Sequence, residues 1–467
     1  MRARRLALAF LIVAAVGAGL AARVRVSSYD PYAQALRGRD LARQLSAYAP
    51  NAAASDVAPR SDVDLRPLEI FYSALQHLRD EYVEPIQKPQ GRELAYGALR
   101  LMLDSLHDPL TRFLDPEQAQ LVQEARAGRF HGIGAVIAVR QTKEGGVVEE
   151  RLVVVSALPD SPARKAGLLA GDVITELDGK TILPYDPLQR VEKLIKASRN
   201  GLIEREKKLP KLLEIENQRI KNGIGFQKAA DMLASKSSKD FTLTIARRGV
   251  KSPLKVKVGV GETVVAPVTY SALNSSVGYV HFNLLTEAAG GKFAEAIADF
   301  KRRGLKGMVL DLRDCPGGAI ESVQEIAGNL IPDKPLAILE LPRGKQRTLR
   351  AGAPSKSGPW TGPVAVIVNG GTVGASEVLG AAIRDGAAAR LVGDRTFGGN
   401  LQETLVPLRD GSAVSMTTGK YLTPKGADYR GEGLTPDVVV PAGSAPPGED
   451  AQLARAVRAL AAGKGKG

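Results

Sequence analysis

Apolar residues between positions 65 and 125 recur every three or four positions, which is the spacing of one face of an α-helix. A first run of this kind extends from Leu68 to Tyr82, and a second extends from Leu94 to Leu106. The positions concerned are Leu68, Phe71, Tyr72, Leu75, Leu78 and Tyr82, followed by Leu94, Leu99, Met102, Leu103 and Leu106. The pattern predicts an N-terminal helical segment over 65–125 that contains two helices.

The pattern changes between residues 126 and 260, where short β-rich runs are separated by glycine-containing turns. These runs are Ala135–Val139, Val147–Val155, Phe241–Ile245 and Leu254–Val258. Within the same region, residues 198–239 are rich in Lys, Glu and Leu, with apolar positions interspersed among the charges. We therefore predict a β-rich domain over 126–260 that carries an insertion of one or two amphipathic helices.

From residue 261 to residue 442, strand-like apolar runs alternate with helical stretches, as they do in α/β domains. The runs are Val277–Phe282, Gly307–Leu312 and Val364–Val368. Residues 443–467 are expected to form a flexible tail. The sequence thus predicts a multidomain α/β fold in which a helical segment, a β-rich domain and a β/α core follow one another.

The first residues have the features of an export signal. Three arginines among residues 1–5 precede an uncharged apolar run from Leu6 to Leu20, and the small residues Ala21 and Ala22 follow. A positive region, an apolar region and small residues in this order are typical of a signal peptide over 1–23, with an uncleaved anchor as the alternative. Residues 24–64 then form a linker. Both alternatives place the body outside the cytoplasm, in the periplasm or on the outer face of the inner membrane.

Composition narrows the function further. The chain has 467 residues, a formal net charge of +14, one cysteine and four histidines. The single Cys315 excludes an intrachain disulfide, and the scattered histidines lack metal-ligand spacing, so neither a metal nor a cofactor is expected. The basic residues are not interleaved with aromatic ones, which argues against nucleic acid and leaves attraction to an anionic membrane surface as a use of the charge.

The β-rich region carries a motif for peptide binding. The segment Ser161-Pro-Ala-Arg-Lys-Ala-Gly-Leu-Leu-Ala-Gly-Asp-Val-Ile-Thr-Glu-Leu-Asp-Gly179 resembles the PDZ signature, and His131-Gly-Ile-Gly-Ala135 resembles its carboxylate-binding loop. A Gly-x-Gly turn that opens a strand leaves N–H groups free to hold a terminal carboxylate, while the strand edge pairs with an extended peptide. Gly132, Ile133, Gly134 and Ala135 are therefore the candidate peptide-binding residues. The alternative is a PDZ fold kept only for packing.

Two motifs of the last domain resemble those of the carboxyl-terminal processing (tail-specific) serine peptidases. Met308-Val-Leu-Asp-Leu-Arg-Asp-Cys-Pro-Gly-Gly318 is similar to the family's strand and its Asp-Leu-Arg-Asn-x-Pro-Gly-Gly turn. Exposed N–H groups at such a turn stabilise developing negative charge. The resemblance implies a crotonase-like core with oxyanion-type N–H groups at Gly317, Gly318 and Ala375.

The family's nucleophile is absent from this chain. Thr372-Val-Gly-Ala-Ser-Glu377 is similar to the family's Ser/Thr-Ala-Ser-Ala-Ser-Glu, in which the middle serine attacks the substrate. Gly374 stands at that place, and glycine has no side chain. Thr372 and Ser376 carry hydroxyls two positions away on either side and are the alternative nucleophiles.

The family's general base is absent as well. The family has a lysine in Thr-Phe-Gly-Lys-Gly-x-x-Gln, whereas this chain has Thr396-Phe-Gly-Gly-Asn-Leu-Gln402, which is one residue shorter. The lysine position falls on Gly399 when counted from Thr396 and on Gly398 when counted from Gln402. Other family features persist over residues 68–440, among them Asp385 and Gln402.

These observations lead to three functional hypotheses. The first is a non-catalytic pseudopeptidase that binds protein C-terminal tails or unfolded polypeptides, or that assists an active processing peptidase. The second is an active serine endopeptidase that uses Thr372 or Ser376 as a displaced nucleophile. The third is an assembly component, such as a homo-oligomer, that joins other chains through its N-terminal helices and its basic insertion.

Overall fold

The computed structural model describes residues 66–462, except residues 85, 145–146, 185–187, 201–207, 237–238, 445 and 447. The chain divides into two units, residues 1–86 and residues 87–467. In the first unit the described element is helix α4 (Arg66–Glu81), while the predicted leader and most of the predicted linker lie outside the described residues. None of the described helices combines the length and the apolar character needed to cross a membrane.

The second unit begins with two helices that flank a short strand. Helix α5 (Lys88–Asp104) packs on β1 (Arg112–Leu114), and the rings of Tyr96 and Phe113 lie 4.7 Å apart. Helix α6 (Pro116–Arg126) follows β1, and the Asp115 side chain caps it by accepting a hydrogen bond from the Gln118 N–H. These two helices begin where a proline in the first turn favours helical backbone.

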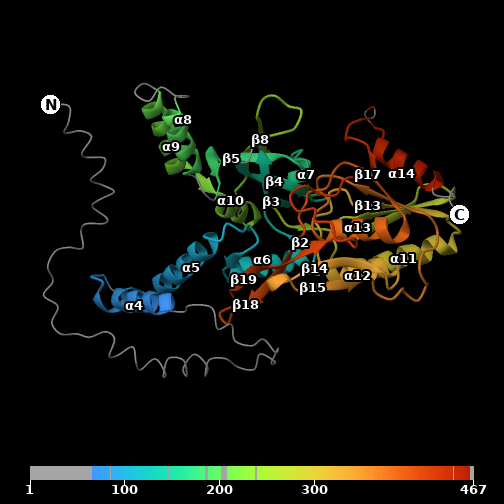
Figure 1. The fold of residues 1–467 in the computed structure, drawn as a ribbon, viewed down its shortest axis with the longest axis horizontal. Coiled ribbons are helices and arrows are strands. Elements are labelled where there is room, and N and C mark those ends of the chain that lie inside the picture. The colour runs from blue at the N-terminus through green and yellow to red at the C-terminus, as the bar shows by residue number, and fades with distance from the viewer. Residues whose placement is uncertain are drawn as a thin grey trace. The chain divides into compact units, whose positions relative to one another are not determined.

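The β-rich region forms a seven-stranded sheet (Figure 1). Its strands are β3 (Ala135–Glu144), β4 (Val147–Ala157), β5 (Val173–Leu177), β6 (Lys180–Leu183), β7 (Ile224–Gly225), β8 (Phe241–Ala246) and β9 (Leu254–Val258). Strand β3 lies at one edge, and β8 pairs with β5 and β9. The helices of this region are α7 (Pro162–Lys165), α8 (Gln189–Arg199), α9 (Leu209–Asn222) and α10 (Phe226–Ala234). Buried side chains such as Ile133, Leu168 and Leu243 form its own core.

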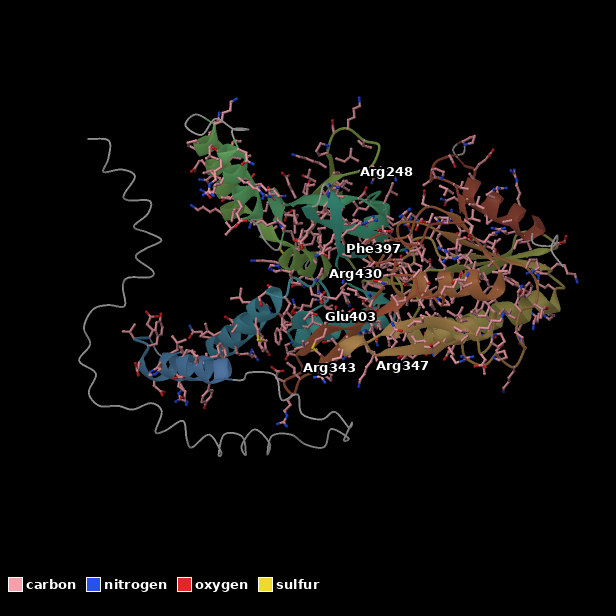
Figure 2. All side chains as sticks on the ribbon, viewed as in Figure 1. Arg248, Arg343, Arg347, Phe397, Glu403 and Arg430 are labelled. Atoms are coloured by element: carbon pink, nitrogen blue, oxygen red, sulfur yellow. The ribbon has the colours of Figure 1, made fainter. Side chains whose placement is uncertain are left out.

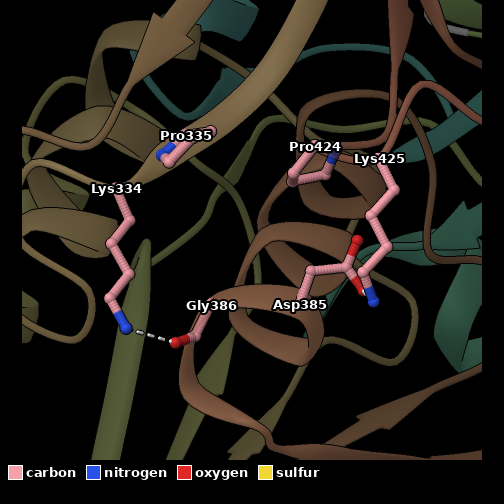
Figure 3. Close-up of a pocket in the computed structure, with 6 residues that line it drawn as sticks. All are labelled: Lys334, Pro335, Asp385, Gly386, Pro424 and Lys425. Carbon is pink, nitrogen blue, oxygen red and sulfur yellow. Dashed lines mark hydrogen bonds and ion pairs between the residues drawn. The ribbon is translucent and has the colours of Figure 1, made fainter.

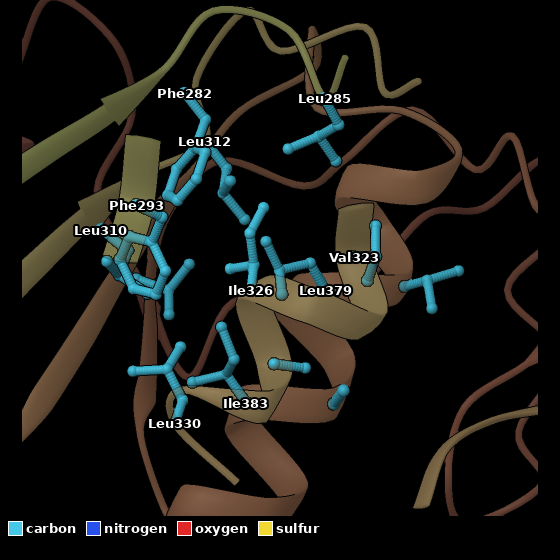
Figure 4. Close-up of a cluster of buried hydrophobic side chains, with 14 of the residues drawn as sticks. Phe282, Leu285, Phe293, Leu310, Leu312, Val323, Ile326, Leu330, Leu379 and Ile383 are labelled. Carbon is cyan, nitrogen blue, oxygen red and sulfur yellow. The ribbon is translucent and has the colours of Figure 1, made fainter. Parts of the chain in front are cut away.

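The last region contains a six-stranded sheet covered by helices on both faces. Its order is β11 (Val268–Ala272), β12 (Val277–Phe282), β13 (Gly307–Asp311), β16 (Val364–Val368), β17 (Arg390–Gly393) and β20 (Val438–Val439), and all pairs except β11 with β12 are parallel. Helices α11 (Ala289–Arg302), α12 (Ile320–Gly328) and α13 (Ala375–Ala387) bury one face in the cluster of Figure 4. Every residue of β13 is buried, as expected for a central parallel strand.

A second, five-stranded antiparallel sheet lies beside this core. It consists of β1, β14 (Pro335–Glu340), β15 (Gln346–Arg350), β18 (Leu401–Pro407) and β19 (Ala413–Leu422). The turn between β14 and β15 contains the short 3-10 helix Pro342–Gly344. Strands β2 (Arg129–Phe130) and β10 (Thr263–Val264) form a separate two-stranded antiparallel sheet. In the chain, β2 comes just before the PDZ-like sheet and β10 comes just after it. The prediction of a multidomain α/β fold is confirmed.

The expectation of a flexible tail over 443–467 is wrong for its described part. Helix α14 (Ala451–Ala462) covers the second face of the six-stranded sheet, where Ala456 and Leu460 pack on Val309 and Ile367. The side chains of α14 that make this contact are Leu453, Ala456, Val457, Ala459 and Leu460, so part of the apolar face consists of small alanines. Their three- and four-residue spacing gives the helix one apolar face.

Candidate functional site

The two family motifs meet at the carboxyl ends of β13 and β16. These neighbouring strands are parallel, so the turns that follow them emerge at the same edge of the sheet. The Val373 N–H donates to the Cys315 carbonyl at 3.2 Å. A Cβ placed on Gly317 would lie 2.7 Å from the Val373 carbonyl oxygen and 3.1 Å from the Ala375 nitrogen. The Pro-Gly-Gly turn is therefore packed against the start of α13.

Gly374 has a backbone conformation that other residues rarely adopt. Its φ is 62° and its ψ is −121°, and α13 begins at the next residue. A sharp turn of this kind between a strand and a helix projects a nucleophile in several hydrolase folds. A turn of this kind is present here, and the residue that occupies it is a glycine, which has no side chain.

The predicted oxyanion-type residues Gly317, Gly318 and Ala375 lie around this turn. Within the described part of the chain, no acceptor takes the N–H of Gly318 or that of Ala375. Gly317 is held by its carbonyl, which accepts from the Leu285 N–H at 2.8 Å. The scaffold can therefore still present two N–H donors to a negative group, although the attacking group is missing.

The two alternative nucleophiles are buried and bonded to the backbone. Thr372 and Ser376 are both 0% exposed. The Thr372 hydroxyl donates to the Leu312 carbonyl at 2.7 Å. The Ser376 hydroxyl lies 2.8 Å from the carbonyls of both Cys315 and Val373 and accepts from the Val373 N–H. Each hydroxyl therefore stabilises a turn and does not face a substrate-accessible surface.

Glu377 joins the nucleophile turn to the loop that should carry the base. One carboxylate oxygen accepts from the N–H groups of Gly374 at 2.9 Å and Gly399 at 2.8 Å. The other accepts from the Thr396 hydroxyl at 2.5 Å and the Gly398 N–H at 2.7 Å. The side chain is 0% exposed, and burial raises the pKa of Glu377 to about 7 in spite of these four donors.

The two candidate base positions, Gly398 and Gly399, differ in backbone conformation and in their neighbours. Gly398 has a φ of +90°, and a Cβ there would lie 2.8 Å from the backbone nitrogens of Gly431 and Gly433. Gly399 lacks a left-handed φ, and a Cβ on it would lie 3.6 Å from the Gly374 nitrogen. Gly374 and Gly399, which the motifs predict as the nucleophile and base positions, are thus in contact with each other.

The two other retained residues lie in different places. The Gln402 Oε1 atom is buried and has no hydrogen-bond partner among the described residues. Asp385 lies ten residues beyond Ala375 on α13, or about 15 Å along the helix axis. There it pairs with Lys425 at 3.1 Å beside a shallow pocket of about 200 Å³ (Figure 3). Asp385 therefore does not take part in the site at Gly374.

The candidate carboxylate-binding loop has fewer free donors than expected. The Ile133 N–H already donates to the Leu233 carbonyl at the end of α10, at 2.9 Å. Ala135 pairs with Ala157 in the sheet, and a Cβ on Gly134 would lie 2.5 Å from the Ser161 Cβ. Gly132 is closed in by the backbone at Leu233 in the same way. The expectation that this whole loop is free to bind a carboxylate needs correction at Ile133.

The PDZ-like sheet packs directly on the base loop. Val153 and Val155 of β4 are buried against Phe397, which is labelled in Figure 2, and against Val373. The Arg140 guanidinium lies 5.3 Å from the centre of the Phe397 ring, a distance at which a cation is attracted to an aromatic face. Strands β3 and β4 therefore contact the loop that should hold the general base.

Sequence reasoning did not identify Glu377 or Arg140. Glu377 is an acidic residue three positions after the N-cap residue Gly374, which is a known signal for capping the first N–H groups of a helix. Nothing in the sequence indicates that its carboxylate also reaches the loop of residues 396–399. Among the described residues, no cluster of His, Cys, Asp and Glu has the arrangement of a metal site.

Comparison with known proteins identifies the family. A model of peptidase family S41 matches residues 276–440, and a PDZ-domain model matches residues 153–206. The chain is 31% identical over 366 residues to the chloroplastic C-terminal processing peptidase of Tetradesmus obliquus, which covers 77% of this chain and 71% of that protein. It is 29% identical over 381 residues to the carboxy-terminal-processing protease of Bartonella bacilliformis, with 80% and 75% covered.

A solved structure agrees with these sequence relationships. The photosystem II D1 C-terminal processing protease superposes with a TM-score of 0.57 and 26% identity, over 80% of this chain and 88% of that one. The family models, the two relatives and this fold point to the same group of proteins. The chain belongs to the PDZ-containing carboxyl-terminal processing peptidases of family S41.

Proposed function

We propose that this protein is a non-catalytic member of its family that binds the C-terminal tails of proteins, or unfolded polypeptides, through its PDZ domain. The proposal rests mainly on two glycines, Gly374 and Gly399, which are close in space. They stand at the positions where the family motifs have the nucleophile and the base, while the surrounding motif residues are present. Hydrolysis by a serine and lysine pair needs a hydroxyl that attacks and an amine that accepts its proton. Neither group exists at these positions.

The displaced nucleophiles do not compensate for this loss. Thr372 and Ser376 are fully buried, and their hydroxyls hold the carbonyls of Leu312 and Cys315. To attack a substrate, either hydroxyl would have to leave its bond, move to the surface and find a base. A misplacement of about 1 Å alone can cost about a hundredfold in rate. The active-endopeptidase alternative therefore has less support.

Strand β3 supports the peptide-binding part of the proposal. It is an edge strand of its sheet, so one row of its backbone groups is open to a further strand. Helix α10 lies beside it, as its contacts with β3 show. An extended peptide that pairs with such an edge gains main-chain hydrogen bonds, and its side chains meet the neighbouring helix.

The cellular setting and the partners remain parts of the same proposal. Export through residues 1–23 would place the protein in the periplasm or on the outer face of the inner membrane. There it would hold tails by itself or assist an active processing peptidase. A homo-oligomer and attraction to a membrane surface are compatible with this role, whereas a nucleic-acid partner is not expected.

Two measurements test the proposal. Fluorescence anisotropy should detect binding of a labelled peptide with an apolar C-terminus, and the same peptide with an amidated C-terminus should bind more weakly. Intact-mass analysis after treatment with a fluorophosphonate should find no adduct. An adduct that disappears in Thr372→Val or Ser376→Ala would contradict the non-catalytic assignment, and equal failure of both peptides to bind would contradict the tail-binding assignment.

A further inference from the structure

The space for a side chain at the base position is already occupied. A Cβ built on Gly399 would lie nearer to the Val373 Cγ2 atom than the 3.0 Å below which real Cβ atoms are not found. Its next neighbour is Phe397 Cδ1 at 3.5 Å, which is an ordinary contact. The obstacle at Gly399 is therefore one methyl group of Val373.

The backbone itself does not exclude a side chain there. Gly399 is not in the left-handed region, in contrast to Gly374 and Gly398 at φ +62° and +90°. The φ of Gly399 therefore lies outside the range that L-amino acids rarely adopt. Among the three atoms nearest to a Cβ built there, the Val373 Cγ2 atom alone is closer than an ordinary contact.

Val373 is held in place by its surroundings. It packs against the cluster of Val153, Val155 and Phe397, through which the PDZ-like sheet contacts the core. A β-branched side chain has few χ1 rotamers, so it cannot easily turn away from Gly399. The family motif Ser/Thr-Ala-Ser-Ala-Ser-Glu has alanine where this chain has Val373, and alanine lacks the methyl groups concerned.

We propose that Val373 fills the space vacated by the catalytic base and converts it into an apolar contact between the PDZ domain and the core. The proposal rests on the non-catalytic function above and adds a mechanism to it. The site then lacks its reactive side chains, and in addition Val373 occupies the space that the base would need. Restoring serine at Gly374 and lysine at Gly399 is therefore insufficient, because the lysine also needs Val373 to become alanine.

A double-mutant cycle on stability tests this directly, without any need for activity. Gly399→Ala should raise the unfolding equilibrium constant about tenfold or more in the wild-type background, since overpacking a dense site is destabilising. In a Val373→Ala background the same change should have no effect or should lower the constant, because the new methyl group enters the space that the valine left. Urea unfolding of the four proteins measures both effects.

Gly291→Ala provides the matched control. A Cβ on Gly291, within α11, meets nothing within 4 Å, so this change should have the same effect in both backgrounds. An equal destabilisation by Gly399→Ala in both backgrounds would overturn the proposal. Cleavage by the wild-type protein would instead contradict the proposed function, so the two failures are distinguishable.

Covalent labelling gives a second, independent measurement. The variant with Gly374→Ser and Gly399→Lys should react with a fluorophosphonate at least tenfold more slowly than the variant that also carries Val373→Ala. Equal rates in the two variants, including no reaction by either, would show that Val373 does not limit the site.

Discussion

The buried carboxylate of Glu377 should make the stability of this protein fall as the pH rises from 5 to 8. Burial raises the pKa of Glu377 to about 7 in the folded protein, against 4.5 for an unperturbed glutamate. Between these two values the folded state binds more protons than the unfolded state. Stability must then decrease with pH in this range. The protonated Glu377 side chain contributes fully to the unfolding free energy below the unfolded pKa of 4.5, and this contribution is lost as the pH rises through 7.

The magnitude follows from the size of this shift. One pKa unit corresponds to about 1.4 kcal/mol, so the change between pH 5 and pH 8 amounts to about 2 to 3 kcal/mol. The perturbation is Glu377→Gln, which removes the titrating group and keeps the shape of the side chain. The difference in unfolding free energy between wild type and variant should fall by this amount across the range, while the other titrating groups cancel.

Urea unfolding at a series of pH values, followed by circular dichroism, measures the difference. Two opposing effects act on the carboxylate, because desolvation disfavours its charge and four hydrogen-bond donors favour it. A difference that rises with pH would mean that the donors outweigh burial and would refute the reasoning. A difference that stays constant would show that the folded and unfolded pKa values are alike.

Three further predictions concern stability, each checked by urea unfolding. Asp172→Asn should cost about 1.5 to 3 kcal/mol, because Asp172 is 1% exposed and its charge pairs with the partly exposed Arg247 at 2.7 Å. Gly318→Ala should destabilise the protein for two reasons: the new Cβ would overlap the carbonyl of Leu285, and the φ of Gly318, +141°, is one that L-amino acids rarely adopt. Leu460→Ala should cost about 2 to 5 kcal/mol, because this side chain is buried where α14 covers the sheet, whereas a merely tethered tail would lose nothing measurable.

Elements that are marked by a continuous apolar run in the sequence could be predicted. The strands at Val277–Phe282 and Val364–Val368 have the bounds expected from their apolar runs. They are buried β-strands, so their sequences consist largely of the residue types that such strands need. Helix α14 was missed because its apolar face is built partly from alanines, which are common in tails as well as in helices.

The site was predictable only in its missing parts. The motifs predict that Gly374 and Gly399 stand where the family has its reactive residues, and this prediction was possible because each motif is local in sequence. The connection of Glu377 to residues 396–399 depends on a contact across about twenty positions, and the obstruction by Val373 depends on the direction of one Cβ. Such contacts follow from packing and leave no periodic pattern. The bond between Ile133 and Leu233 was invisible for the same reason.

The most direct test of the central claim is the cleavage of an unfolded reporter with an apolar C-terminal tail by the purified wild-type chain. The variant with Val373→Ala, Gly374→Ser and Gly399→Lys is measured beside it. The account predicts no cleavage by the wild type, since neither position of the pair has a reactive side chain. Wild-type cleavage that is abolished by Thr372→Ala or Ser376→Ala would contradict the claim and would identify the nucleophile that replaced the missing serine.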